Sequence, residues 1–283
     1  MKNGKIILIP TSGLANRIRI MAVAINLARN SEKKIIVYWD KNIGLHAHFD
    51  DLFELPPGIT VKKIPFPYKI WLKMRQYSSK LLGVDTWYIR LFKYDFVFLD
   101  NMAEQVWHNK LNLQVEVDKA TKVLICSCQE FNYFNLEDYR LFMPKAILRE
   151  SIDRVCHNFT HNTIGVHIRA TDNEVSKQFS PFNIFMLQIE KEISQHPHVT
   201  FFLSTDEPEY QEKLVKKFGE DIILYHEKVF GRNVTSGIQD AVIDLFCLSK
   251  TSKIYGSYYS SFSEVAGRIG NIPVEVLKIE EKN

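Results

Sequence analysis

The chain has 283 residues, of which 46% are hydrophobic and 24% are charged, a composition typical of globular proteins and unlike that of low-complexity or collagenous chains. Its length suits two compact domains better than one core. The formal net charge of +3 argues against a protein that wraps nucleic acid with its whole surface, and no nucleic-acid-binding module is recognisable.

The first half opens with a strand, a turn and a helix. Residues 5–9 form an apolar run, residues 10–13 interrupt it, and residues 15–29 have helical periodicity. Further apolar runs at 35–39, 94–99 and 122–126 predict strands, aromatic helical segments fill 68–92, and a helix at about 144–159 connects two domains. This order predicts an N-terminal α/β domain over residues 1–150.

The second half alternates strands and helices strictly. The predicted strands are 163–168, 199–203, 222–225, 253–255 and 274–277, and the predicted helices are 182–194, 207–218, 236–249 and 261–269. Short loops between such elements are typical of a parallel, doubly wound sheet. We therefore expect a C-terminal Rossmann-like domain over residues 151–283.

Ligands of open parallel sheets bind beyond the carboxyl ends of the strands. The first strand is followed by TSGLANR, where Gly13 permits a tight turn and the next helix offers free N–H groups to an anion, with Asn16 and Arg17 at its opening. The stretch lacks the GK[ST] ending of a P-loop and is not GxGxxG. An ordinary strand-turn-helix with a capping serine explains it as well.

The strand 163–168 is followed by Arg169 and Asp172. An arginine at this edge can grip phosphate oxygens in a bidentate way, and the alternative is a local ion pair between Arg169 and Asp172. His167 alternates with Val166 and Ile168, so its side chain is expected on the opposite face of the sheet. Either a hydrogen-bonded core histidine or a functional group fits that position.

Two further strand ends carry polar groups. Asp206 follows the strand 199–203 and suits either a helix cap or a ribose or base contact. After the strand 253–255, Gly256 is expected to free the backbone, and Ser260, Ser261 and Ser263 offer hydroxyls at a helix N-terminus. Because these anion-holding elements share one edge with Arg169, a diphosphate is the simplest ligand.

These motifs resemble those of the GDP-fucose-dependent fucosyltransferases related to the nodulation, core α1,6 and protein O-fucosyltransferases, including bacterial members. The resemblance is carried by GLANR (13–17), VHIRATD (166–172), LSTD (203–206), GIQDAVIDLFCLSK (237–250) and GSYYSSFSEVA (256–266). It implies a GT-B-like α/β fold with two facing Rossmann-like domains of parallel sheets, residues 1–150 being the acceptor side. It also implies inverting transfer of fucose from GDP-fucose to a glycan hydroxyl, with no metal ion and no cofactor.

The resemblance also assigns roles to residues. Arg169 would hold the donor β-phosphate as the essential catalytic residue, and Asp172 and Glu174 are the other catalytic candidates. The residues expected to bind the donor are Asn16, Arg17, His167, Asp206, Asp244, Ser260, Ser261 and Phe262. Many relatives carry a second arginine where this chain has Ala170, and Lys177 stands where some place a glutamate. The general base is therefore left open among Glu174, Asp172 and a phosphate oxygen.

Two other readings remain open from the sequence. One is a transferase of the same fold that uses another nucleotide sugar, and the other is a non-catalytic nucleotide-binding protein that kept the fold.

Residues 62–93 contain eight Lys and Arg residues against one acid, Asp85, with aromatic residues between them. Such a segment suits either an anionic membrane or a lipid-linked glycan, or else helices with a solvated basic face. The N-terminal apolar run is too short for a signal peptide, and the four cysteines have neither metal-ligand spacing nor disulfide-scaffold density. We expect a cytoplasmic protein, with a peripheral position at the inner membrane face as the further alternative.

Overall fold

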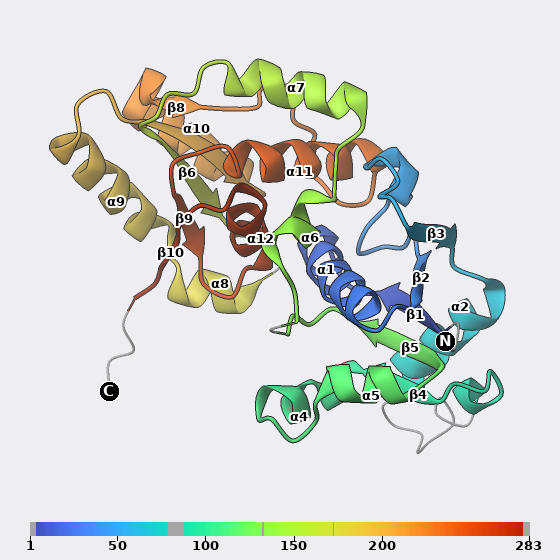
Figure 1. The fold of residues 1–283 in the computed structure, drawn as a ribbon. Coiled ribbons are helices and arrows are strands. Elements are labelled where there is room, and N and C mark those ends of the chain that lie inside the picture. Colours follow the sequence, from blue (N-terminus) through green and yellow to red (C-terminus); the bar gives the residue numbers. More distant parts are fainter. Residues whose placement is uncertain (1–3, 79–87, 132, 172, 280–283) are drawn as a thin grey trace. The chain divides into compact units, whose positions relative to one another are not determined.

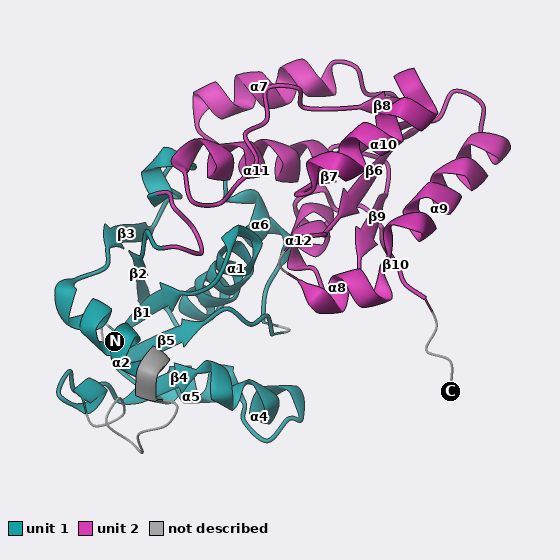
Figure 2. Ribbon diagram, turned by 180° about the vertical axis from the view of Figure 1, so that it is seen from behind, with its two compact units in different colours: residues 1–42, 48–143 teal, residues 43–47, 144–283 magenta. Residues whose placement is uncertain are grey.

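The computed structural model describes residues 4–78, 88–131, 133–171 and 173–279. The chain forms two compact units (Figure 2). Unit 1 comprises residues 1–42 and 48–143, and unit 2 comprises residues 43–47 and 144–283. Among the described residues, no helix combines the length and the apolar character that crossing a membrane requires.

Unit 1 is built around a five-stranded parallel sheet with the order β3-β2-β1-β5-β4. Its elements are β1 (Lys5–Pro10), α1 (Leu14–Asn30), β2 (Lys34–Trp39), β3 (Ile59–Lys63), α2 (Phe66–Ser78), β4 (Phe96–Leu99), α4 (Ala103–Trp107), α5 (Leu113–Lys119), β5 (Lys122–Ser127) and α6 (Leu136–Arg140). The two central strands, β1 and β5, are almost wholly buried, as expected for strands with helices on both faces.

The helices of unit 1 cover the sheet by burying one apolar stripe each. α2 contributes Tyr68 and Trp71 to a core cluster with Ile7, Ile9 and Leu124 of the central strands. α1 packs against β1 and β2 and is buried along most of its length. Ser12, with a φ of 68°, makes the tight turn between β1 and α1.

Unit 2 has a second five-stranded parallel sheet with the order β10-β9-β6-β7-β8. Its elements are α7 (Ala146–Cys156), β6 (Thr163–Ile168), α8 (Glu174–Phe179), α9 (Phe182–Gln195), β7 (Thr200–Thr205), α10 (Pro208–Phe218), β8 (Ile222–Ile223), α11 (Thr235–Leu248), β9 (Ile254–Ser257), α12 (Ser261–Gly270) and β10 (Val274–Leu277). The chain moves outward from β6 to β8 and then returns to the other side of β6 with β9. The switch point of the sheet therefore lies between β6 and β9.

Helices α9 and α12 lie on opposite faces of the unit 2 sheet (Figure 1), and alternation along β6 directs its side chains to both faces. Val166 and Ile168 join the core cluster that includes Phe185 and Ile189 of α9. His167 points to the other layer, where its ring stacks on Phe262 of α12. The predicted orientation of His167, opposite to its apolar neighbours, is confirmed.

The predicted α/β architecture with a parallel sheet in each half is confirmed, and β6 and β10 have the predicted bounds. Four short helices, α4, α5, α6 and α8, and the edge strand β3 were not predicted. β9 extends to Ser257, so Gly256 lies inside a strand and not in a loop. Its lack of a side chain matters because an added Cβ would lie 2.4 Å from Ser263 Oγ.

Candidate active site

The polar side chains of unit 2 gather where β6, β7 and β9 end. The parallel register pairs Ile168 with Thr205 and His167 with Gly256, so the residues that follow these strands emerge side by side. The residues that directly follow β6, β7 and β9 are Arg169, Asp206 and Tyr258, respectively. This is the edge at which open α/β sheets bind ligands.

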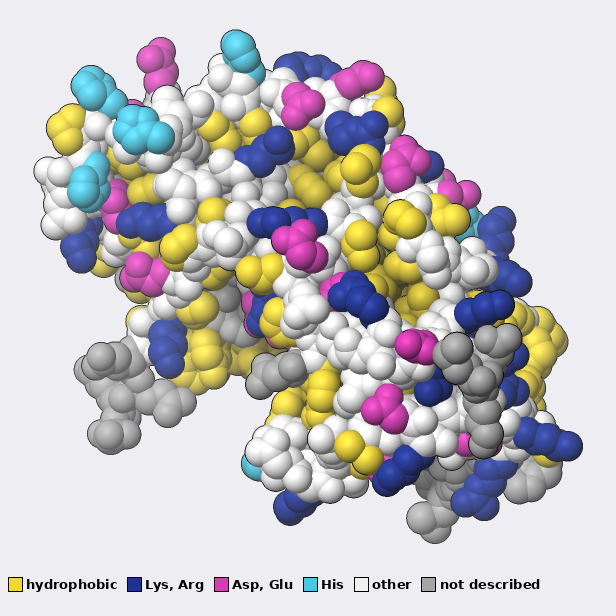
Figure 3. All heavy atoms as spheres, viewed as in Figure 1, with side chains coloured by type: hydrophobic (Ala, Val, Ile, Leu, Met, Phe, Trp, Pro, Cys, Tyr) yellow, Lys and Arg dark blue, Asp and Glu magenta, His cyan; other side chains and the backbone are white. Residues whose placement is uncertain are grey.

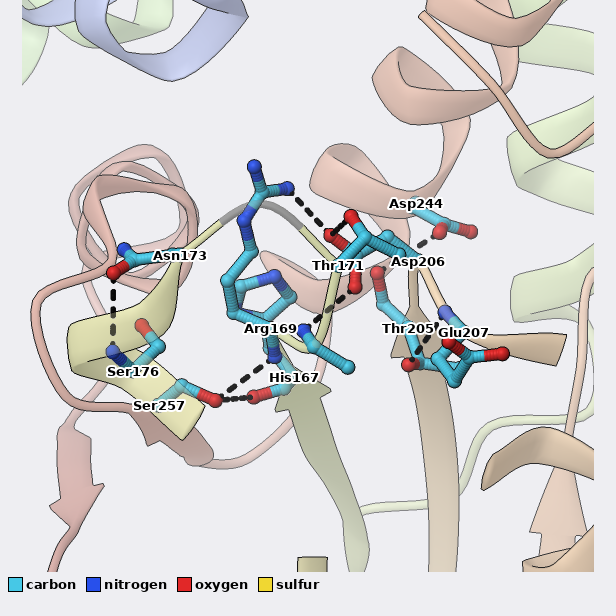
Figure 4. Close-up of polar contacts among 12 residues, drawn as sticks. His167, Arg169, Thr171, Asn173, Ser176, Thr205, Asp206, Glu207, Asp244 and Ser257 are labelled. Atoms are coloured by element: carbon cyan, nitrogen blue, oxygen red, sulfur yellow. Dashed lines mark hydrogen bonds and ion pairs between the residues drawn. The ribbon is translucent and has the colours of Figure 1, made fainter. Parts of the chain in front are cut away.

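Arg169 is held at this edge through its side chain and its backbone. Its Nη1 lies 2.7 Å from Oδ2 of Asp206, and the Arg169 side chain is 15% exposed. Its backbone N–H donates to Ser257 Oγ of β9 at 2.9 Å. Figure 4 shows the guanidinium directed toward Asp206 and away from the strand. A fixed, partly buried guanidinium loses little freedom when an anion binds, which favours bidentate phosphate recognition.

Asp206 accepts three hydrogen bonds from the segment after β6. Besides Arg169, the N–H of Ala170 donates to Oδ1 at 2.7 Å, and Thr171 Oγ1 donates to Oδ2 at 2.8 Å. Burial works to raise the pKa of Asp206, but Arg169, the Ala170 amide and the Thr171 hydroxyl outweigh it and hold that pKa below its ordinary value. The carboxylate is thus ionised and shapes the loop that carries Arg169.

His167 lies beneath this loop and is 5% exposed. Its ring stacks on Phe262 with the centroids 4.8 Å apart, and its Nδ1 is buried without a hydrogen-bond partner. Burial lowers its pKa to about 3, against the opposing attraction of Asp206. The imidazole is therefore neutral at physiological pH and is a weak base.

Hydrogen bonds from the start of α8 hold the turn between β9 and α12. Asn173 caps α8 through Ser176 N–H and donates to the carbonyl of Tyr259 at 3.1 Å. Ser176 Oγ donates to the carbonyl of Tyr258 at 2.5 Å. Tyr259 has a φ of 57°, a conformation that costs a bulky residue about 1 kcal/mol. These bonds hold the start of α12 in place.

Ser260 and Ser261 stand at the N-terminus of α12, where the unpaired N–H groups of the helix point outward. Ser260 makes no side-chain cap, and Ser263 is buried with its hydroxyl 3.5 Å from the carbonyl of Ser260. Of the three predicted serines, Ser260 and Ser261 are therefore the ones placed to meet a ligand. The positive end of this helix and Arg169 lie at the ends of adjacent strands, which suits an anion.

Asp244 of α11 lies beside the end of β7. Its Oδ2 accepts from Ser204 Oγ at 2.8 Å and from Lys228 Nζ at 2.5 Å, and its Oδ1 is buried without a partner. Lys228 also donates to the carbonyl of Thr205 at 2.6 Å. Sequence reasoning missed Lys228, because it lies in an irregular loop with no motif.

The other predicted site residues have different surroundings. Glu174, in the first turn of α8, is 85% exposed and pairs with Lys177 at 2.9 Å. Asp172 lies outside the described residues. Arg169 pairs with Asp206, a carboxylate from the neighbouring strand end.

Asn16 and Arg17 belong to unit 1. Arg17 is fully buried and donates to the carbonyls of Ser12 at 2.8 Å and Asp40 at 2.6 Å. Burial lowers the pKa of Arg17 to about 10 despite the attraction of Asp40. Asn16 donates to Ser12 Oγ at 2.9 Å, and its Oδ1 is buried without a hydrogen-bond partner. Arg17 thus fixes the loops after β1 and β2.

Within the described parts of the chain, no group of three or more His, Cys, Asp and Glu side chains is arranged to hold a metal ion.

No family model and no curated protein matches the sequence, but solved structures match over nearly the whole chain. NodZ α-1,6-fucosyltransferase soaked with GDP-fucose has 18% sequence identity and a TM-score of 0.61, covering 95% of this chain and 93% of its own. FUT1 of Arabidopsis thaliana, in complex with GDP, has 16% identity and a TM-score of 0.59, over 99% and 71%. POFUT1 in complex with GDP has 12% identity and a TM-score of 0.56, over 99% of both chains. The chain therefore shares the α/β fold of NodZ, FUT1 and POFUT1, as its motifs predicted.

Proposed function

We propose that the protein is a glycosyltransferase that transfers fucose from GDP-fucose to a glycan hydroxyl with inversion at the sugar carbon. The observation that carries this proposal is the guanidinium of Arg169, fixed by Asp206 at the end of β6 next to the strand that leads into α12. The proposal draws further support from the fold shared with NodZ, whose crystal was soaked with GDP-fucose.

In this reaction Arg169 stabilises the leaving group. As the acceptor oxygen attacks fucose C1, the bond to GDP breaks and negative charge accumulates on the diphosphate. A preorganised cation interacts more strongly with that charge than with the intact donor, so it lowers the barrier and does not merely tighten binding. Removing a comparable oxyanion donor costs about 3–4 kcal/mol of barrier.

The neighbouring residues have supporting roles in this proposal. Asp206 holds Arg169 in its orientation and is a positioning residue. Ser260, Ser261 and the N-terminus of α12 receive phosphate oxygens. Asp244, with one buried carboxylate oxygen unsatisfied, lies on the nucleoside side.

The general base in this proposal is a group other than His167. His167 is buried and its pKa of about 3 makes it a poor proton acceptor. The candidates are Glu174, which reaches solvent beside Lys177, Asp172, and a donor phosphate oxygen. Comparing the pH profiles of Glu174→Gln and Asp172→Asn distinguishes them, since loss of a base removes its acidic limb.

The acceptor in this proposal is a glycan bound on the side of unit 1, free or carried on a lipid. A lipid-linked acceptor would bring the protein, cytoplasmic by our proposal, to the inner face of a membrane.

The test is a donor screen with purified protein. Thermal shift with GDP, UDP and their sugars, followed by measurement of nucleotide and sugar release, is expected to give stabilisation by GDP and release of GDP and fucose from GDP-fucose. Preference for a UDP-sugar would show another transferase of the same fold. Binding of GDP with no turnover in the presence of a glycan panel would indicate the non-catalytic alternative.

A further inference from the structure

We propose that unit 1 docks on an anionic lipid bilayer through a basic edge, which consists of the exposed side chains of Lys62, Lys63, Lys69, Lys73, Arg90 and Lys93. In Figure 3, Lys and Arg side chains gather on the right-hand side of the view, over β3 and α2. Residues 62–75 and 88–93 contain no Asp or Glu. This docking proposal uses the proposed function only to explain why a position at a membrane would be useful, namely to reach a lipid-linked acceptor.

The structure separates the aromatic residues of this segment from its cations. Tyr68 and Trp71 are buried in the core of unit 1, so they belong to the fold and not to a docking surface. Phe66, Lys69 and Lys73 lie at i, i+3 and i+7 on the opposite, exposed face of α2. Phe66 is 73% exposed, a large apolar side chain in the same row as two cations.

The segment 88–93, which carries Arg90 and Lys93, lies beside α2. Phe92, between them, packs on Tyr68 with the ring centroids 4.9 Å apart. The neighbouring Leu91 is 59% exposed. Two exposed apolar side chains thus lie among the six cations, which is the pattern of a protein that inserts apolar groups while its charges meet lipid headgroups.

Ion pairs within the described part of unit 1 account for only one of these six cations. Lys69 lies 3.9 Å from Asp40, and within the described residues the other five have no carboxylate at ion-pair distance. Lys69 also falls in the first turn of α2, which contains no acid, where a cation is unfavourable to the helix dipole. Lys62 and Lys63 lie on the edge strand β3, where lysines also prevent pairing with another strand. This second explanation does not apply to the other four cations, because they lie outside the sheet.

Charge and apolar side chains together favour a bilayer over a soluble polyanion. Each Lys or Arg near an anionic membrane strengthens binding by about fivefold, and a soluble polyanion offers no apolar layer for Phe66 and Leu91. The occupant we infer is therefore a membrane surface that contains acidic phospholipid.

The experiment is co-sedimentation of the full chain with vesicles of phosphatidylcholine, with and without phosphatidylserine at about one lipid in three. We expect binding only to the anionic vesicles and its loss when salt is raised to about 0.5 M. The triple variant Lys69→Glu, Lys73→Glu, Arg90→Glu should bind more weakly by a factor of at least about a hundred. Phe66→Ser should bind about tenfold more weakly, with the salt dependence retained.

A matched control reverses three exposed lysines elsewhere, Lys110, Lys191 and Lys216, and should keep wild-type binding although its net charge changes equally. Equal loss in the control, binding to neutral vesicles, or no binding by the wild type overturns the proposal, as does a Phe66→Ser variant that binds like the wild type. Release of GDP from GDP-fucose in solution should be the same in the patch variant. Failure of docking and failure of the proposed chemistry are therefore distinguishable.

Discussion

Replacement of His167 should reduce the sensitivity of the protein to mild acid. The imidazole is buried against Phe262, and its pKa falls from 6.5 to about 3, chiefly by burial. In the unfolded chain the same group titrates near 6.5. Between these two values the unfolded chain binds a proton that the native protein does not.

The sign and size of the effect follow from this difference. The contribution of His167 to the free energy of unfolding is fully present above about pH 6.5. It decreases by about 1.4 kcal/mol for each pH unit as the pH falls from 6.5 toward 3. Between about pH 7.5 and about pH 5 the loss is therefore about 2 kcal/mol. His167→Phe, which keeps a ring beside Phe262, and His167→Gln, which keeps a polar group, should both lack this component.

Urea unfolding of the wild type and both variants at the two pH values measures it. The matched control is His161→Gln, which removes an exposed histidine just before β6 and should lose as much stability in acid as the wild type. If the wild type and both His167 variants lose the same free energy of unfolding on acidification, the buried, neutral state of His167 is wrong.

Two further substitutions test the packing and the charge arrangement of the site. Asp206→Asn removes the anion that lies 2.7 Å from Arg169. We expect the free energy of unfolding to fall by about 1–3 kcal/mol and kcat to fall more than KM rises. An unchanged kcat in steady-state kinetics would exclude a positioning role. Gly256→Ala would place a Cβ 2.4 Å from Ser263 Oγ. Thermal unfolding should therefore show a free energy of unfolding lower by about 1–3 kcal/mol, and adding Ser263→Gly should restore part of it. A single variant as stable as the wild type would contradict the close packing of β9 and α12.

The sheets were predictable because their central strands are continuous apolar runs with short connections. β3 was missed because its sequence, ITVKK, is short and ends in two lysines, a composition that an edge strand tolerates and a buried strand does not. α8 was missed because it has six residues, too few for a periodic pattern to appear. Its role in pinning the turn before α12 could not be inferred without the tertiary contacts.

The sequence was enough to predict which strand ends form the site. It was not enough to predict which side chains pair with one another there. The sequence offered a local ion pair between Arg169 and Asp172, which lies outside the described residues. It did not suggest Asp206, which pairs with Arg169 because the β6–β7 register that pairs Ile168 with Thr205 places the next residue of each strand side by side. Aligning the predicted strands by their first residues, 163 and 199, would have paired Arg169 with Thr205, because the observed register pairs Thr163 with Thr200.

Ser257 could have been found by the same reasoning, because its strand runs in register with β6. Lys228 could not, since it reaches Asp244 from a loop whose path depends on α11.

The most direct measurement is the initial rate of GDP and fucose release from GDP-fucose by wild type, Arg169→Ala and Arg169→Lys, with guanosine and GDP affinities measured alongside. Loss of about 3–4 kcal/mol of transition-state stabilisation predicts that Arg169→Ala is slower by a factor of at least about a hundred. Arg169→Lys should recover only part of this rate, because an ammonium lacks the bidentate geometry, and guanosine binding should be unchanged in both variants. Turnover by Arg169→Ala within about tenfold of the wild type would contradict the assignment of Arg169 to the leaving diphosphate.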